Sequence, residues 1–194
     1  MKGNHIENGI LQWGLLICPS MGYLCIRRVL TAIPAREEAE LAFITLLLIV
    51  LWILLRKHIP VIQRGFRELC CTAMLPIFAG LVIGWISVKI SYNAKASGSV
   101  WAFLTVCVVG PACEEIIYRG ITYELASRLG GPIFAVVISA LLFAFGHGGL
   151  PQIAFAVPVG LLLGMLRKAK GDFLAPLILH WTINMTVFFL SGAA

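Results

Sequence analysis

The sequence predicts an all-α fold, a polytopic bundle of about seven membrane-spanning helices, with six to eight as the range. Of 194 residues, 60% are hydrophobic and only 12% are charged, and the mean hydropathy is +0.95. A soluble domain is usually about half apolar and about a quarter charged. Apolar stretches also recur along the chain at close to the roughly 20 residues that a helix needs to cross a bilayer. We therefore expect a multi-pass integral membrane protein with a single domain over residues 1–194.

Seven apolar runs are the candidate spans. In chain order they cover residues 10–26, 41–55, 69–90, 99–119, 132–146, 151–167 and 173–190. The first run is the weakest candidate, because Gln12, Pro19 and Ser20 interrupt it. Only the segment GHGGLP separates the fifth run from the sixth, which predicts a tight helical hairpin there.

Basic residues outnumber acidic ones by 15 to 9 and lie in short clusters between the apolar runs. This pattern is typical of membrane topology, so we expect no nucleic-acid partner. If all seven runs span, the loops with more Lys and Arg face the cytoplasm, with the N-terminus inside and the C-terminus outside. The basic residues on that side are Lys2, Arg56, Lys57, Arg64, Arg67, Arg128, Arg167, Lys168 and Lys170, against Arg27, Arg28, Arg36, Lys89 and Lys95 on the other.

Ionisable side chains inside the apolar runs mark the candidate site, because charge at membrane depth is costly and usually faces the interior of a bundle. In the stretch EEIIYRG, Glu115 and Arg119 are four residues apart and share a helix face, so the guanidinium can neutralise that carboxylate. Glu114 is rotated about 100° from its neighbour. The pattern predicts one structural ion pair and one carboxylate that is free to act as a general base on water.

Two histidines and an asparagine complete the candidate site. His180 and Asn184 are four residues apart, so their N–H groups point the same way and suit a developing oxyanion. Helix lengths place His147 at a depth similar to that of Glu114. We therefore expect Glu114 and His147 to bind and deprotonate a water, in a hydrolase that acts on a carbonyl group. Phe143 precedes His147 by one turn and is expected to orient its ring.

Three motifs in this order resemble a known family. They are EExxxR at residues 114–119, FxxxH from Phe143 to His147, and HxxxN from His180 to Asn184. On separate helices they resemble the CPBP family of intramembrane proteases, also called ABI proteins, which includes prenylated-CAAX endopeptidases and bacteriocin-associated proteins. The resemblance covers roughly residues 100–190. It makes residues 99–194 the expected catalytic core, while the helices over 1–98 carry no recognised motif.

The resemblance implies a glutamic protease that needs no metal or other cofactor. Glu114 would be the base that works with His147, and His180 and Asn184 would form the oxyanion site. Glu115 and Arg119 match the other charged positions of the first motif and would support it. The implied partner is a membrane-anchored protein or peptide, with a prenylated CAAX-like tail or a C-terminal sorting anchor. The expected location is a prokaryotic cytoplasmic membrane.

Other classes of function stay open from the sequence. A zinc-dependent membrane hydrolase is the first, because Glu and two His are ligands of many catalytic zinc sites, although the chain has no HExxH pair. A non-enzymatic proton- or ion-coupled carrier is the second, because buried Glu and His also form proton relays. A thiol protease based on Cys113 is least favoured. The six cysteines show no CxxC spacing, so we expect neither disulfides nor a zinc cluster. The sequence indicates neither the specific substrate nor the oligomeric state.

Overall fold

The computed structural model describes residues 3–30, 36–55, 66–90 and 98–192. Over these ranges the backbone is almost entirely helical and contains no strand, which confirms the predicted all-α class. In chain order the helices are α1 (Gly3–Leu30), α2 (Arg36–Leu55), α3 (Phe66–Ile90), α4 (Val100–Phe103), η1 (Leu104–Val109), α5 (Gly110–Glu115), η2 (Ile116–Thr122), α6 (Tyr123–Phe145), α7 (Leu150–Lys170) and α8 (Leu174–Leu190), where η denotes a π-helix. Each of the seven predicted runs lies on these helices, apart from single residues at run ends.

The helical stretch from α4 to α6 contains one break, at Gly131. Its backbone has φ 82° and ψ 177°, which is outside the helical region and which a residue with a side chain rarely adopts. Pro132 follows and has no amide N–H to continue the helical hydrogen bonds. The fourth and fifth predicted runs are therefore two helices that meet at this glycine.

Among the residues that the structure describes, two helical stretches are long and apolar enough to cross a membrane, judged by length and composition. They are Val100–Phe145 and Leu150–Lys170. Shorter apolar helices cover Leu16–Ile26, Ala73–Lys89 and Leu174–Leu190. The outer faces of α2 and α3 expose large apolar side chains, including Leu46, Ile53, Leu75 and Phe78. A surface of this kind is typical of contact with lipid, and it favours the expected integral membrane protein.

The predicted orientation in the membrane depends partly on residues outside the described ranges, so it stays a prediction. These residues are Lys2, Arg56, Lys57, Arg64 and Lys95.

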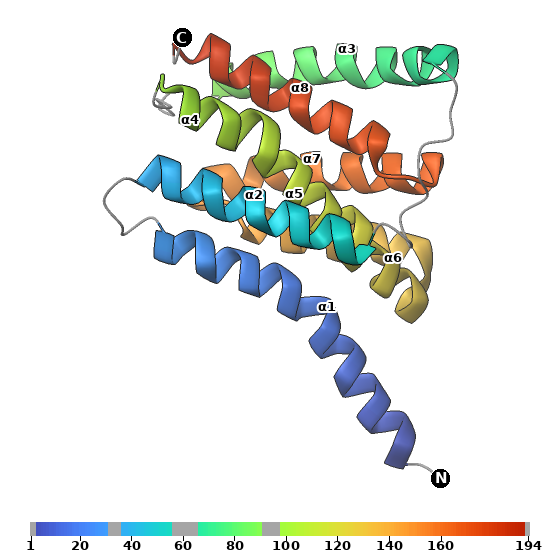
Figure 1. The fold of residues 1–194 in the computed structure, drawn as a ribbon. Helices are drawn as coiled ribbons and strands as arrows, with labels where there is room; N and C mark the ends of the chain where they lie inside the picture. The colour runs from blue at the N-terminus through green and yellow to red at the C-terminus, as the bar shows by residue number, and fades with distance from the viewer. Residues whose placement is uncertain (1–2, 31–35, 56–65, 91–97, 193–194) are drawn as a thin grey trace.

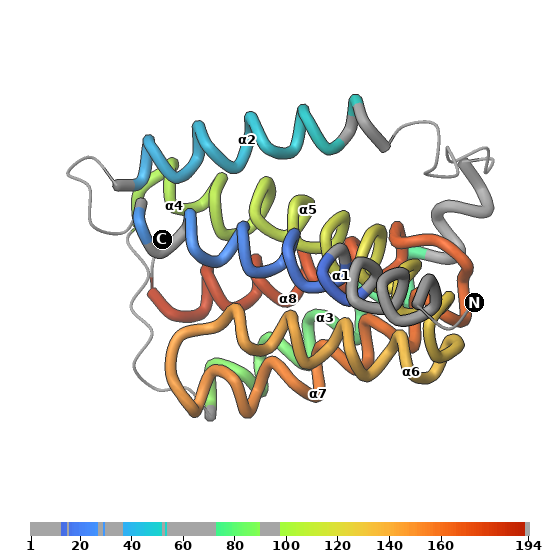
Figure 2. The backbone as a smooth tube through the Cα atoms, turned by 90° about the horizontal axis from the view of Figure 1, so that it is seen from below, coloured from blue at the N-terminus to red at the C-terminus, as the bar shows by residue number. Residues whose placement is uncertain are grey.

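The predicted hairpin between the fifth and sixth runs is present as α6 and α7. The chain reverses over residues 146–149, and Gly149 at its end has a positive φ of 87°. Gly160 of α7 lies so close to α6 that an added Cβ would be 3.1 Å from the Cα of Ala140. Figure 2 shows this pair on one side of the bundle and α2 on the other. Small residues at the crossing let the two backbones approach closely.

Helices α3 and α8 lie side by side (Figure 1) and pack through a second pair of small residues. An added Cβ at Gly80 would lie 2.6 Å from the Cβ of Thr182, and one at Gly84 would lie 2.6 Å from the Cβ of Thr186. The spacing of four residues on both helices keeps the contact along one seam. This seam attaches α3 to α8, which carries His180.

We expect Gly80→Ala to destabilise the protein by about 1–3 kcal/mol, because the new methyl group overpacks the α3–α8 seam. Thermal unfolding of the detergent-solubilised protein, followed by circular dichroism, measures the effect. Gly22→Ala is the matched control: it lies within helix α1, and an added Cβ there meets nothing within 4 Å. A loss of stability at Gly80 no greater than that at Gly22 would show that the seam is not tightly packed.

Candidate active site

The two adjacent glutamates lie on α5, a short α-helix between two π-helices. The amide of Gly110 donates to the carbonyl of Thr105, five residues earlier, which closes η1. An added Cβ at Gly110 would collide with that carbonyl, so this position needs a glycine. Short π-helical segments often occur at functional sites, since they change the direction of the side chains that follow.

Glu115 and Arg119 form the ion pair that their spacing predicts. Arg119 Nη1 lies 3.1 Å from Glu115 Oε1, and both side chains are fully buried. Nη2 of Arg119 donates to the carbonyl of Gly160 at 3.1 Å, and the guanidinium carbon of Arg119 lies 4.6 Å from the centre of the Phe143 ring. Arg119 thus connects α5, α6 and α7 inside the bundle, where a charge needs such partners.

Arg167 extends this network to the basic end of α7. Its Nε donates to the backbone carbonyl of Arg119 at 3.1 Å, and its guanidinium lies 5.1 Å from the centre of the Tyr123 ring. Nη2 of Arg167 also lies 3.9 Å from Oε2 of Glu124. The sequence alone indicates for Arg167 only a basic charge that helps to orient the chain in the membrane.

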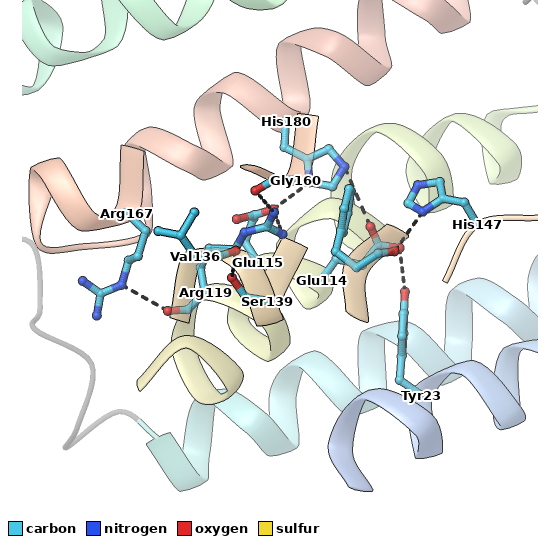
Figure 3. Close-up of polar contacts among 11 residues, drawn as sticks. Tyr23, Glu114, Glu115, Arg119, Val136, Ser139, His147, Gly160, Arg167 and His180 are labelled. Carbon is cyan, nitrogen blue, oxygen red and sulfur yellow. Dashed lines mark hydrogen bonds and ion pairs between the residues drawn. The ribbon is translucent and has the colours of Figure 1, made fainter. Parts of the chain in front are cut away.

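His180 lies between the two glutamates (Figure 3). Its Nδ1 is 2.9 Å from Glu115 Oε1, and its Nε2 is 3.8 Å from Glu114 Oε2. An ionised carboxylate only accepts hydrogen bonds, so we assign a proton to Nδ1. The buried imidazole therefore presents Nε2 toward Glu114.

Glu114 is 8% exposed and has a partner from the N-terminal part of the chain. The hydroxyl of Tyr23, on α1, donates to Glu114 Oε1 at 3.3 Å (Figure 3). Tyr23 could not be predicted from the sequence, because it lies 91 residues from Glu114 and no helical spacing connects the two positions.

His147 joins the site through Phe143. The Nδ1 of His147 lies 3.0 Å from the carbonyl of Phe143, which can only accept, so the proton is assigned to Nδ1. In the neutral tautomer that carries this proton, Nε2 keeps a lone pair. The Phe143 ring lies edge-on to both imidazoles, with centroid distances of 4.7 Å to His147 and 5.4 Å to His180. The one-turn spacing from Phe143 to His147 therefore does produce the expected contact.

Asn184 lies on the same helix as His180 but contacts η1. Its side-chain nitrogen donates to the carbonyl of Val106 at 2.8 Å. That carbonyl lacks its usual backbone donors, because the amide of Gly110 bonds Thr105 and Pro111 has no N–H. Asn184 thus supplies the hydrogen bond that the change of helical register removes. Its role in an oxyanion site stays a prediction.

No group of three or more His, Cys, Asp and Glu side chains in the described ranges could hold a metal ion. The side chains of Cys18, Cys25, Cys107 and Cys113 are free thiols. Of the predicted site residues, six form one connected cluster: Glu114, Glu115, Arg119, Phe143, His147 and His180. Their chemical roles stay predictions.

Comparisons with known proteins point to a membrane peptidase. The chain is 24% identical to the "Putative membrane peptidase YdiL" of Bacillus subtilis (strain 168), covering 76% of this chain and 68% of that protein. It is 34% identical to the "UPF0177 protein YbdJ" of Lactococcus lactis subsp. lactis (strain IL1403), covering 42% of this chain but only 35% of that protein. No solved structure matches the chain.

The family match lies over the cluster described above. Residues 96–186 match the family described as type II CAAX prenyl endopeptidase Rce1-like. This region runs from just before α4 into α8 and includes all the predicted site residues. Over residues 96–186, a little under half of the chain, the sequence is therefore similar to the Rce1-like type II CAAX prenyl endopeptidases, and this similarity points to a protease.

Proposed function

We propose that this protein is an intramembrane endopeptidase that hydrolyses a peptide bond of a membrane-associated protein with activated water and without a metal. The family and the relative named as a membrane peptidase support the protease activity. The position of His180 is the observation that carries the mechanism. Its two ring nitrogens lie 2.9 Å and 3.8 Å from two buried carboxylates. A buried acid beside an imidazole can supply the proton transfers that amide hydrolysis needs.

Glu114 is the proposed general base and His147 its partner in holding the water. The lone pair on Nε2 of neutral His147 accepts one hydrogen of the water, and Glu114 accepts the other as its proton. The water oxygen forms a bond to the carbonyl carbon, the C–N bond breaks, and the proton on Glu114 moves to the departing nitrogen. Burial of Glu114, Glu115 and His180 would limit the access of bulk solvent to the reaction.

His180 and Asn184 are the proposed donors to the oxyanion. Nε2 of His180 can donate only when the ring carries both protons, and the two neighbouring carboxylates compensate that charge. The carboxamide of Asn184 has two N–H groups, and the contact with Val106 uses one of them. We assign the second N–H of Asn184 to the oxyanion.

The proposed substrate is a membrane-anchored protein that carries a prenylated CAAX-like tail or a C-terminal sorting anchor. The printed description of the family supports the first, since it names a CAAX prenyl endopeptidase. The apolar outer faces of the helices support approach of the substrate from the lipid. The two relatives are bacterial, and we propose the cytoplasmic membrane of a prokaryote as the location.

Purified protein in liposomes tests this function directly. Two peptides are supplied, one ending in a farnesylated CAAX tail and one with a C-terminal hydrophobic anchor, and mass spectrometry identifies the products. We expect a single cleavage site in at least one peptide, and activity that persists after treatment with a zinc chelator. His147→Ala, purified in parallel, is expected to give no product, which excludes a contaminating protease.

Three results would contradict the proposal. Activity that the chelator removes and zinc restores would favour the zinc hydrolase. Proton or ion flux through the liposomes without any peptide product would favour the carrier. Equal products from the wild type and from His147→Ala would mean that this site does not catalyse the reaction.

A further inference from the structure

We propose that Tyr23 is a positioning residue for Glu114, so that helix α1, outside the family match at residues 96–186, completes the active site. The inference rests on the proposed function, because it gives Tyr23 a part in the reaction that Glu114 carries out. Three observations support it: the contact with the carboxylate, the packing that aims the phenol, and the chemical difference between the partners of the two glutamates.

The contact joins two buried side chains far apart in sequence. Tyr23 is 2% exposed and Glu114 is 8% exposed, and the phenol oxygen lies 3.3 Å from Glu114 Oε1. Helix α1 also reaches the histidine hairpin, since an added Cβ on Gly146 would be 3.0 Å from a methyl carbon of Leu24. The same part of α1 is therefore beside both the carboxylate and the turn that holds His147.

The packing of α1 sets the direction of the phenol. Leu16, Ser20 and Tyr23 form one buried stripe on this helix, with exposures of 1%, 0% and 2%. The hydroxyl of Ser20 lies 3.4 Å from the hydroxyl of Thr122 on η2, and both residues are fully buried. Residues spaced by three and four lie on one helix face, so the packing of Leu16 against α6 keeps this face, and Tyr23 with it, turned into the bundle.

The chemistry of the phenol suits a base rather than a structural acid. Glu115 is held by the cation of Arg119, which binds an ionised carboxylate tightly. Tyr23 is a neutral donor, so it can fix the orientation of Glu114 without adding a positive charge of its own. By holding Oε1, the phenol leaves Oε2 facing Nε2 of His180, the side on which a water can be deprotonated.

The first test compares Tyr23→Phe with Ser20→Ala. Each removes one hydroxyl from the same face of α1, but only the first removes a contact with Glu114. With the farnesylated CAAX peptide we expect Tyr23→Phe to lower kcat by about tenfold to a hundredfold, since the lost hydrogen bond is to a charged group, and to leave KM within about twofold. We expect Ser20→Ala to leave kcat within about twofold. Equal effects of the two variants would overturn the proposal.

The second test needs no activity. In protein with ¹³C-labelled glutamate, the infrared carboxylate band of Glu114 is the band that Glu114→Gln removes. We expect Tyr23→Phe to shift this band and Ser20→Ala to leave it in place. An unshifted band overturns the inference, whatever happens to kcat. If Tyr23→Phe shifts the band but the wild type cleaves neither peptide, the proposed function alone is overturned. If Tyr23→Phe does not fold, the Glu114 band of the wild type must shift when the hydroxyl hydrogen of Tyr23 is exchanged for deuterium. An unshifted band then overturns the inference.

Discussion

Glu114→Gln is expected to abolish peptide cleavage while the protein still folds and inserts into membranes. Glutamine keeps the shape of the side chain and can still accept from Tyr23, but its amide oxygen is far too weak a base to take a proton from water. General bases contribute about a hundredfold to ten-thousandfold to a rate, so kcat/KM should fall by at least that range. Cleavage of the two peptides in liposomes, followed by mass spectrometry, measures the loss.

Glu124→Gln is the control for this experiment. Glu124 is about half exposed and lies on α6, so its replacement removes a carboxylate that contacts no member of the buried cluster. It is expected to cleave at the wild-type rate. If Glu114→Gln cleaved as fast as Glu124→Gln, the reaction would have to proceed through another base.

Arg119→Met is expected to destabilise the protein by about 3–5 kcal/mol, because it leaves the Glu115 carboxylate buried without its cation. The contact with the carbonyl of Gly160 is lost at the same time. Unfolding of the detergent-solubilised protein by heat or by added denaturing detergent measures the effect. A fall in activity should accompany it, since Glu115 also holds His180.

The chain provides a matched pair for this comparison. Arg128 and Glu124 have the same residue types and the same spacing, with a nitrogen–oxygen distance of 3.2 Å, but their side chains are 72% and 49% exposed. Arg128→Met is expected to cost about 0.5 kcal/mol or less, as solvent screens an exposed pair. A double variant with Glu115→Gln and Arg119→Met should recover part of the lost stability, because no buried charge remains uncompensated. Similar costs for Arg119→Met and Arg128→Met would contradict this view of the buried pair.

Local spacing predicted much of the fold and part of the site. The apolar runs located the helices, because the length of a spanning helix is set by the bilayer. The four-residue spacing of Glu115 and Arg119 predicted their ion pair, because neighbours on one helix face are brought together by the helix itself. The same argument placed Phe143 beside His147.

Spacing within one helix could not predict the contacts between helices. His180 and Asn184 do share a helix, but His180 contacts Glu115 whereas Asn184 contacts Val106. That second contact follows from the π-helix η1, whose backbone register the residue pattern did not reveal. Tyr23 was missed for the same reason, since its partner belongs to a distant part of the chain.

One signal was present in the sequence but was not used. Gly80 and Gly84, and likewise Gly160 and Gly164, are spaced as small residues often are where membrane helices cross. Both pairs lie at close helix contacts in the structure. The spacing could have indicated that α3 and α7 each pack tightly against a neighbour, although not which neighbour.

The ring of Phe143 packs against both imidazoles, the guanidinium of Arg119 and the ring of Tyr118. These groups come from α6, α8, η2 and the turn after α6, so a tilt of any one of these segments is transmitted to the others through one rigid plane. Partial disorder at the centre is therefore disfavoured, and the site should be gained or lost as a unit.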